Sequence, residues 1–240
     1  MAAPRELHWS AAIRVLAYAH QHLNEMELEI GGGGLELRGY ADADFAKDAD
    51  RKSVSGYVFF IGSSTLSWAS KKQKNVVLNG THAEHNTLVL SAKEALSLRQ
   101  ICAFFRAQGG RPPPIKIHQD NLSCVAIAEK GQTSALTKHC DTEDLWLKEQ
   151  IDDRKFILEP VRLEHMLADV LTKPMDAAQL RYFFLFYTRC VGPVPPKVAR
   201  MAGAGILDKD AKKKFQKWHR AYMKQQRAPQ RIILTVGVFL

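Results

Sequence analysis

Residues 35–69, LELRGYADADFAKDADRKSVSGYVFFIGSSTLSWA, hold three strand-like runs in close succession. In the first run, residues 35–43, apolar and polar side chains alternate, as they do in a half-buried strand. The second and third runs cover residues 56–61 and 65–69, and the Gly-Ser-Ser between them is typical of a hairpin turn. Because strands joined by short connections pair antiparallel, this stretch predicts the start of a sheet.

Downstream of this stretch, helical and strand-like patterns alternate. The elements expected there are, in order, a helix over 81–107, a strand over 115–118, helices over 121–129 and 141–151, a strand over 156–161 and a last helix from about Glu164. A further helix is expected upstream, over residues 8–23. Strands separated by helices join a sheet through crossovers, so the sequence predicts a mixed five-stranded α/β sheet.

The net charge of +9 is confined to one end of the chain of 240 residues. Residues 1–190 contain 23 Lys and Arg against 23 Asp and Glu, whereas residues 191–240 contain 11 against two. A positive excess favours polyanionic partners. Here it describes only the last fifth of the chain, beyond a Pro- and Gly-rich stretch near residues 191–196.

Composition excludes several classes of protein. With 46% hydrophobic and 25% charged residues, the chain has ordinary globular composition rather than that of a disordered chain. No apolar run reaches the length of about 18 residues that a membrane span needs, and no secretory signal is recognised at the N-terminus. The four cysteines are far apart and include no C-x-x-C pair, which favours a reducing, intracellular compartment, cytoplasmic or nuclear.

Carboxylates lie at the ends of predicted strands and on predicted helices that face them. They are Asp42, Asp44, Glu84, Asp120 and Asp169. If the strand ends converge, these acids meet in one cleft, where their repulsion would need a divalent cation such as Mg²⁺ or Mn²⁺. Two such ions could activate a water molecule for phosphodiester hydrolysis. Taken singly, each acid also fits an ordinary role at a helix cap or in a first helical turn, and spacing alone does not assemble the set.

A series of short motifs carries a closer signal than the acids themselves. There are six of them, in the order GYADADFA…DRKSVSGYVF…SWASKKQ (39–73), THAE (81–84), AKEA (92–95), QDN (119–121), TKHCD (137–141) and LADVLTKP (167–174). In this order they resemble the ribonuclease H domain of copia-type retrotransposon polyproteins. The helix expected over residues 8–23 resembles the segment that joins reverse transcriptase to that domain.

The resemblance implies an RNase H-like fold, with helices on both faces of the sheet, that cuts the RNA strand of an RNA–DNA hybrid. It carries the four metal-binding, catalytic acids onto Asp42, Glu84, Asp120 and Asp169, with two Mg²⁺ or Mn²⁺ ions as cofactors. Asp44 shares a strand face with Asp42, but the motif selects Asp42. The implied partners are the hybrid and the reverse transcriptase portion of a polyprotein, with no membrane span.

The implied domain organisation has three parts. A connection-like helical segment covers residues 1–34, an RNase H-like domain covers 35–188, and a basic tail covers 189–240. The tail is expected to form a basic helix over residues 208–227 with interleaved aromatics, which suits phosphate, a membrane surface or a partner groove. The plainer alternative, which we favour, is a helix docked on the core or translated sequence without a selected role.

Other residues are candidates for supporting roles. His165 is the candidate proton shuttle, because it precedes Asp169 by four residues and would share its helix face. Lys71, Lys72 and Lys74 could bind nucleic-acid phosphates or form a solvated hairpin end, and Asn121 is a nucleic-acid-binding candidate from the QDN motif.

Departures from the family pattern leave a second hypothesis open. His82 and His85 flank Glu84 where the family has an acid and an aromatic residue, and Asn79 and Gly80 replace Ser/Thr-rich residues. The alternative function is therefore a catalytically decayed, nucleic-acid-binding fragment of the same kind of element.

Overall fold

The structure is a computed structural model that describes residues 5–21, 26–27, 36–47, 49–62, 64–105, 112–130, 141–176, 179–180, 183, 187 and 189–190. The chain divides into two compact units. The larger unit is made of residues 30–183, and the smaller unit combines residues 1–29 with residues 184–240. The larger unit contains the sheet that the sequence predicts.

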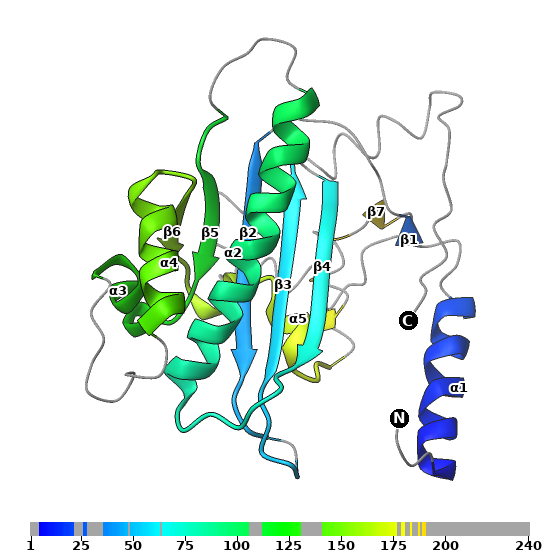
Figure 1. Cartoon of the computed structure of the whole chain (residues 1–240). Helices are drawn as coiled ribbons and strands as arrows, with labels where there is room; N and C mark the ends of the chain where they lie inside the picture. Colours follow the sequence, from blue (N-terminus) through cyan, green and yellow to red (C-terminus); the bar gives the residue numbers. More distant parts are fainter. Residues whose placement is uncertain are drawn as a thin grey trace, which may run out of the picture. The chain divides into compact units, whose positions relative to one another are not determined.

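Five strands form the central sheet of the larger unit (Figure 1). They are β2 (Leu37–Asp44), β3 (Val54–Ile61), β4 (Ser64–Lys72), β5 (Ile115–Gln119) and β6 (Phe156–Pro160). Their order across the sheet is β4-β3-β2-β5-β6. The first three strands in sequence pair antiparallel, whereas β5 adds parallel to β2 and β6 adds parallel to β5.

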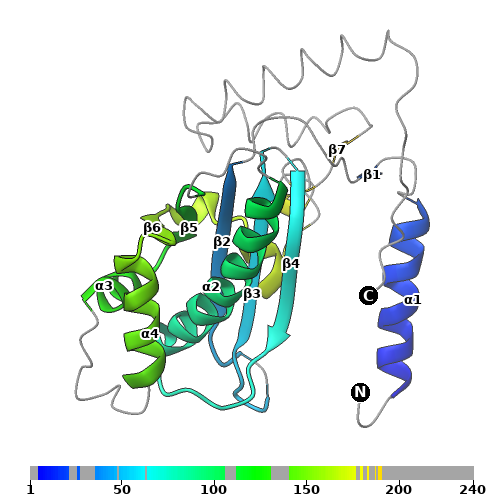
Figure 2. The ribbon, with the colours of Figure 1, turned by 45° about the horizontal axis from the view of Figure 1, so that its top comes forward.

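Helices cover both faces of this sheet. On one face lie α2 (Gly80–Phe105), α3 (Leu122–Lys130) and α4 (Asp141–Asp152). Figures 1 and 2 both show α2 lying across β2 and β3. The short helix α5 (Asp169–Thr172) packs on the opposite face against β2, β3 and β4. The predicted architecture, a mixed five-stranded sheet with helices on both faces, is confirmed.

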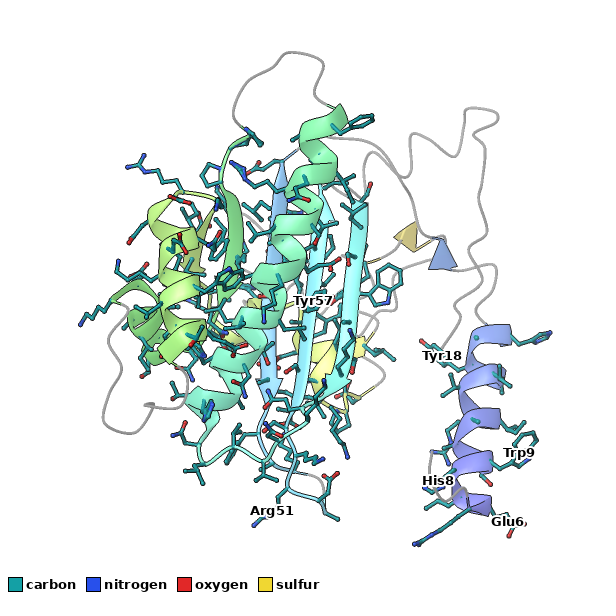
Figure 3. The ribbon with its side chains drawn as sticks, in the orientation of Figure 1. Glu6, His8, Trp9, Tyr18, Arg51 and Tyr57 are labelled. Atoms are coloured by element: carbon teal, nitrogen blue, oxygen red, sulfur yellow. The ribbon has the colours of Figure 1, made fainter. Side chains whose placement is uncertain are left out.

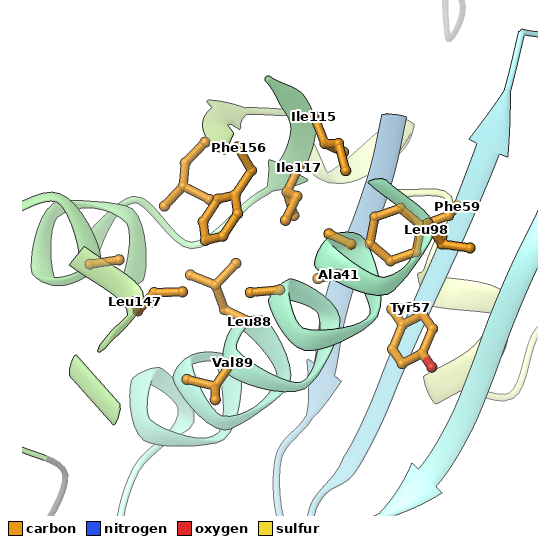
Figure 4. Close-up of a cluster of buried hydrophobic side chains, with 14 of the residues drawn as sticks. Ala41, Tyr57, Phe59, Leu88, Val89, Leu98, Ile115, Ile117, Leu147 and Phe156 are labelled. Carbon is orange, nitrogen blue, oxygen red and sulfur yellow. The ribbon is translucent and has the colours of Figure 1, made fainter. Parts of the chain in front are cut away.

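Side-chain alternation along β3 separates the two layers. Tyr57 and Phe59 point into a buried apolar cluster with Leu88 of α2 (Figure 4). Gly56, one residue earlier, points to the other face, where a Cβ atom would lie 2.6 Å from Cγ2 of Thr172. The lack of a side chain at Gly56 therefore lets α5 approach the sheet closely.

Two sequence-based expectations about this unit are wrong. The last helix does not run continuously from Glu164, because a 3₁₀ turn over Leu163–His165 ends at Met166, whose backbone is extended. Residues 166–168 between this turn and α5 are buried. Burial is the ordinary expectation for a tryptophan in a strand, but Trp68 on the edge strand β4 is 50% exposed.

The smaller unit contains α1 (Glu6–Gln21) and a two-stranded antiparallel pair of β1 (Met26–Glu27) and β7 (Arg189–Cys190). The expected N-terminal helix is therefore present, and Trp9 projects from it with most of its surface exposed (Figure 3). The tail helix expected over residues 208–227 lies outside the described residues. Within the described part of the chain, no helix is long and apolar enough to cross a membrane.

Candidate active site

Asp42 lies near the carboxyl end of the central strand β2 and is almost completely buried, with 1% of its surface exposed. Both of its carboxylate oxygens have partners on the chain that follows β6. The Thr172 hydroxyl donates a hydrogen bond to Oδ2, and the Lys173 ammonium donates to Oδ1 at 3.1 Å. Asp42 therefore has a fixed orientation below α5.

Glu84 reaches the same sheet end from α2, just after the first turn of that helix. Asn79 precedes this helix, and its Oδ1 accepts the backbone N–H of His82 at 2.8 Å, as an N-cap residue does. The backbone N–H of Ala43 donates to Oε2 of Glu84 at 3.0 Å. The helix start thus aims a carboxylate at the backbone beside Asp42.

Asp120 follows β5 directly, and the residue before it organises its surroundings. Gln119 is completely buried. Its Oε1 accepts the backbone N–H groups of Asp120 at 2.8 Å and Asn121 at 3.2 Å, while its Nε2 donates to Glu84 Oε2 at 3.4 Å. One amide side chain therefore connects the β5 turn to the carboxylate on α2, a role that the sequence analysis did not recognise.

These elements bring three carboxylates together. One oxygen from each of Asp42, Glu84 and Asp120 lies within 4.8 Å of the others. Burial, and then the neighbouring charges of Asp42 and Asp120, raises the pKa of Glu84 to about 9. Burial and the charge of Asp42 also raise the pKa of Asp120. The cluster therefore crowds three acidic groups in a place that suits a hard divalent cation, which would favour their ionised form.

Asp169, the fourth predicted acid, joins this cluster through a lysine. Asp169 is the first residue of α5, and Lys173 Nζ lies 2.7 Å from its Oδ1 as well as 3.1 Å from Asp42 Oδ1. Burial raises the pKa of Asp169 to about 6, against the opposing effect of the Lys173 hydrogen bond. Burial alone would lower the pKa of the Lys173 ammonium, but its contacts with Asp169 and Asp42 outweigh that effect and raise it.

Several known proteins are similar to this chain in sequence. No family model matches the chain. The retrovirus-related Pol polyprotein of transposon TNT 1-94 from Nicotiana tabacum is 33% identical over 171 residues, and that of transposon RE2 from Arabidopsis thaliana is 31% identical over 198 residues. The chain is a homologue of the copia-type retrovirus-related Pol polyproteins.

The two matches cover 71% and 80% of this chain but only 13% of each Pol polyprotein. The chain thus spans a small part of the length of these Pol homologues. Among solved structures, LC11-RNase H1, isolated from compost, aligns with a TM-score of 0.44 and 14% identity over 57% of this chain and 93% of its own.

The remaining candidate residues of this Pol homologue lie in different places, and none belongs to the three-carboxylate group. His165 lies in the 3₁₀ turn and not in α5, so the helix face that it was expected to share with Asp169 does not exist. The Oδ1 atom of Asn121 accepts the N–H of Cys124 at 3.0 Å and caps α3. Asp44 is paired with Lys47 at 2.8 Å, apart from the three-carboxylate group.

The three lysines near the start of α2 are exposed but not equivalent. Lys71 and Lys72 end β4, and Lys74 follows in the connection to α2. Lys72 forms an ion pair with Asp50 at 3.2 Å. Exposure at the end of β4 is compatible both with phosphate contact and with a solvated hairpin end.

Proposed function

We propose that the protein is a metal-dependent ribonuclease H that hydrolyses the RNA strand of RNA–DNA hybrids as part of a retrotransposon Pol polyprotein. The observation that carries this proposal is the convergence of Asp42, Glu84 and Asp120 within 4.8 Å, with Asp169 linked to Asp42 through Lys173. An RNase H-like fold in a homologue of Pol polyproteins supports the same class of enzyme.

The donor set fits Mg²⁺ or Mn²⁺ because it consists of carboxylate oxygens, those of Asp42 and Glu84 buried and that of Asp120 half-buried. We assign Asp42, Glu84, Asp120 and Asp169 as the residues that would hold two such ions. When bound, the ions would supply an activated water molecule and neutralise the charge that develops on the leaving oxygen.

The protein's own groups prepare the carboxylates for this task. The hydroxyl of Thr172 fixes Asp42, while the Ala43 N–H and the Gln119 amide fix Glu84. Carboxylates that are held before the substrate arrives do not have to reorganise during the reaction. This preorganisation supports a catalytic function for the cluster.

Hybrid binding in this proposal depends on shape rather than on base sequence, through the minor groove and its 2′-hydroxyl groups. Lys71, Lys74 and the side-chain N–H₂ of Asn121 are the proposed contacts, with Lys72 shared between Asp50 and the nucleic acid. The proton-shuttle role of His165 stays a prediction without the helix face that suggested it.

The proposal is tested with an end-labelled RNA–DNA hybrid incubated with the full chain and Mg²⁺. We expect cleavage of the RNA strand, and we expect Asp120→Asn to reduce its rate on the order of a hundredfold or more. Asp152→Asn is the matched control, because Asp152 is an exposed acid on α4 that should leave the rate unchanged. Duplex DNA and duplex RNA of the same sequence test substrate selectivity.

Absence of cleavage by the wild-type chain would overturn the proposal, as would cleavage that Asp120→Asn leaves intact. Hybrid binding without Asp120-dependent cleavage would instead indicate the decayed, nucleic-acid-binding fragment. In that case, deletion of residues 197–240 should weaken binding if the basic tail carries it.

A further inference from the structure

Lys173 places a positive charge inside the proposed metal site. Its side chain is 26% exposed, and its ammonium lies between a nearly buried Asp42 and an Asp169 that is 13% exposed. Both contacts are charge-assisted hydrogen bonds, the stronger class of such bonds in proteins. Lys173 therefore neutralises part of the carboxylate charge by itself.

Lys173 makes direct contacts with Asp42 and Asp169, while its charge also acts on Glu84 and Asp120. The oxygens that converge within 4.8 Å come from Asp42, Glu84 and Asp120, whereas Lys173 bridges Asp42 and Asp169. An ion shared by Asp42 and Asp169 would need oxygens that the ammonium now contacts. On the same carboxylate, Oδ2 of Asp42 already accepts the Thr172 hydroxyl.

We propose that Lys173 acts as a built-in competitor for the second divalent ion, occupying the Asp42–Asp169 half of the site until that ion displaces its ammonium. This inference rests on the proposed function, because it assumes that the acids bind metal. It assigns different properties to the two halves of the site. The half formed by Asp42, Glu84 and Asp120 binds first, and the half formed by Asp42 and Asp169 binds weakly.

Lys173 has a second consequence in the same proposal. Without metal, its ammonium contacts both Asp169 and Asp42 and offsets the repulsion between these two carboxylates. The ammonium thus stabilises the pair of acids at low metal concentration, at the expense of affinity for the second ion.

The test compares wild-type protein with Lys173→Met, whose side chain has similar length and no charge. Binding of Mn²⁺ to the full chain is followed by the electron paramagnetic resonance signal of free Mn²⁺, and thermal melting is measured in EDTA. We expect Lys173→Met to tighten the weaker Mn²⁺ site by about tenfold, the effect of removing one competing charge-assisted contact. Its melting temperature in EDTA should fall.

Lys148→Met is the matched control. Lys148 forms an ion pair with Asp152 at 2.8 Å across the same four-residue spacing, but on α4 and away from the carboxylates of the site. This variant should leave Mn²⁺ binding unchanged. Lys173→Gln provides a second neutral variant with a hydrogen-bond donor, in case the methionine variant does not fold.

The possible outcomes separate the two proposals. If the wild-type chain does not bind Mn²⁺, or if Asp42→Asn leaves Mn²⁺ binding unchanged, the proposed metal site itself is wrong. If the wild-type chain binds Mn²⁺ but the weaker site is unchanged or weaker in both neutral variants of Lys173, the metal site stands and the competitor role of Lys173 is overturned.

Discussion

Glu84 has the most unusual environment among the acids of the site. It is 9% exposed, it accepts hydrogen bonds from Ala43 and Gln119, and burial with its acidic neighbours raises its pKa to about 9. At neutral pH the metal-free folded protein therefore holds a proton on Glu84, whereas the unfolded chain does not. This difference couples folding to pH.

The stability of the metal-free protein should fall as the pH rises. Below the ordinary pKa of Glu84, about 4.5, both the folded and the unfolded chain carry the proton. Between about 4.5 and about 9 only the folded chain keeps it, so the stabilisation is lost progressively across this window. The raised pKa values of Asp120 and Asp169 act in the same direction.

Melting curves in EDTA from pH 5 to pH 9 measure this effect, and we expect a decrease on the order of 5 °C or more. Glu84→Gln should flatten the profile, because the amide stays neutral like the protonated acid. Glu149→Gln, an exposed substitution on α4, should keep the wild-type slope. A Glu84→Gln profile as steep as that of the wild type would contradict the assignment.

At the level of helices and strands, α5 depends on a single missing side chain. A Cβ atom at position 56 would lie 2.6 Å from Thr172 Cγ2 and 3.0 Å from Leu171 Cβ. The hydroxyl of Ser70 on β4 also donates to the backbone oxygen of Leu171 at 2.6 Å. The position of α5, and with it of Thr172 and Lys173, is therefore set by its close approach to the sheet.

Gly56→Ala should push α5 away from β3. We expect destabilisation of about 1–3 kcal/mol from overpacking, and a loss of hybrid cleavage of about a hundredfold because the partners of Asp42 move. Thermal melting and the cleavage assay measure the two effects. Gly80→Ala is the matched control, since a Cβ atom there meets nothing within 4 Å. Wild-type cleavage by Gly56→Ala would show that the spacing of α5 is not critical.

Periodicity predicted the sheet and its large helix well, because these elements have one buried face. Leu88, Ala92 and Ala95 recur at helical spacing and are completely buried in α2. The region after residue 161 was predicted less well. There the direction of the chain depends on where buried residues 166–168 find space, which is a tertiary effect that no local pattern records.

At the scale of the whole molecule, the sequence motifs identified the acids but not the groups that hold them. Asp42, Glu84 and Asp120 were named from the motifs, and the structure brings them together. Gln119 and Lys173 belong to the same motifs, yet their contacts reach segments far away in the chain. Such contacts follow from the sheet order and cannot be derived from spacing.

The net positive charge lies outside the part of the chain that holds the carboxylates. The excess of +9 lies in residues 191–240, outside the described part of the structure, whereas residues 1–190 are neutral in sum. In the proposed function, hybrid binding by the sheet unit would therefore depend on local groups such as Lys71 and Lys74. The salt dependence of its affinity should accordingly be shallow.

The strand order also has a consequence for folding kinetics. The antiparallel pairs β2–β3 and β3–β4 join neighbours in sequence, whereas the parallel β2–β5 pair joins Tyr40 to His118 across the whole of α2. Distant pairings close large loops and tend to form late. Because Asp42 and Asp120 stand on opposite sides of this late pairing, their mutual repulsion arises only when the chain is nearly native.

Divalent ions should then act after the main folding barrier, slowing unfolding while leaving the folding rate almost unchanged. Stopped-flow chevron plots in Mn²⁺ and in EDTA distinguish the two limbs, and acceleration of the folding limb by Mn²⁺ would place the carboxylate cluster earlier on the pathway. Because of the strand order that builds the site, bound metal would thus also slow the unfolding of the protein.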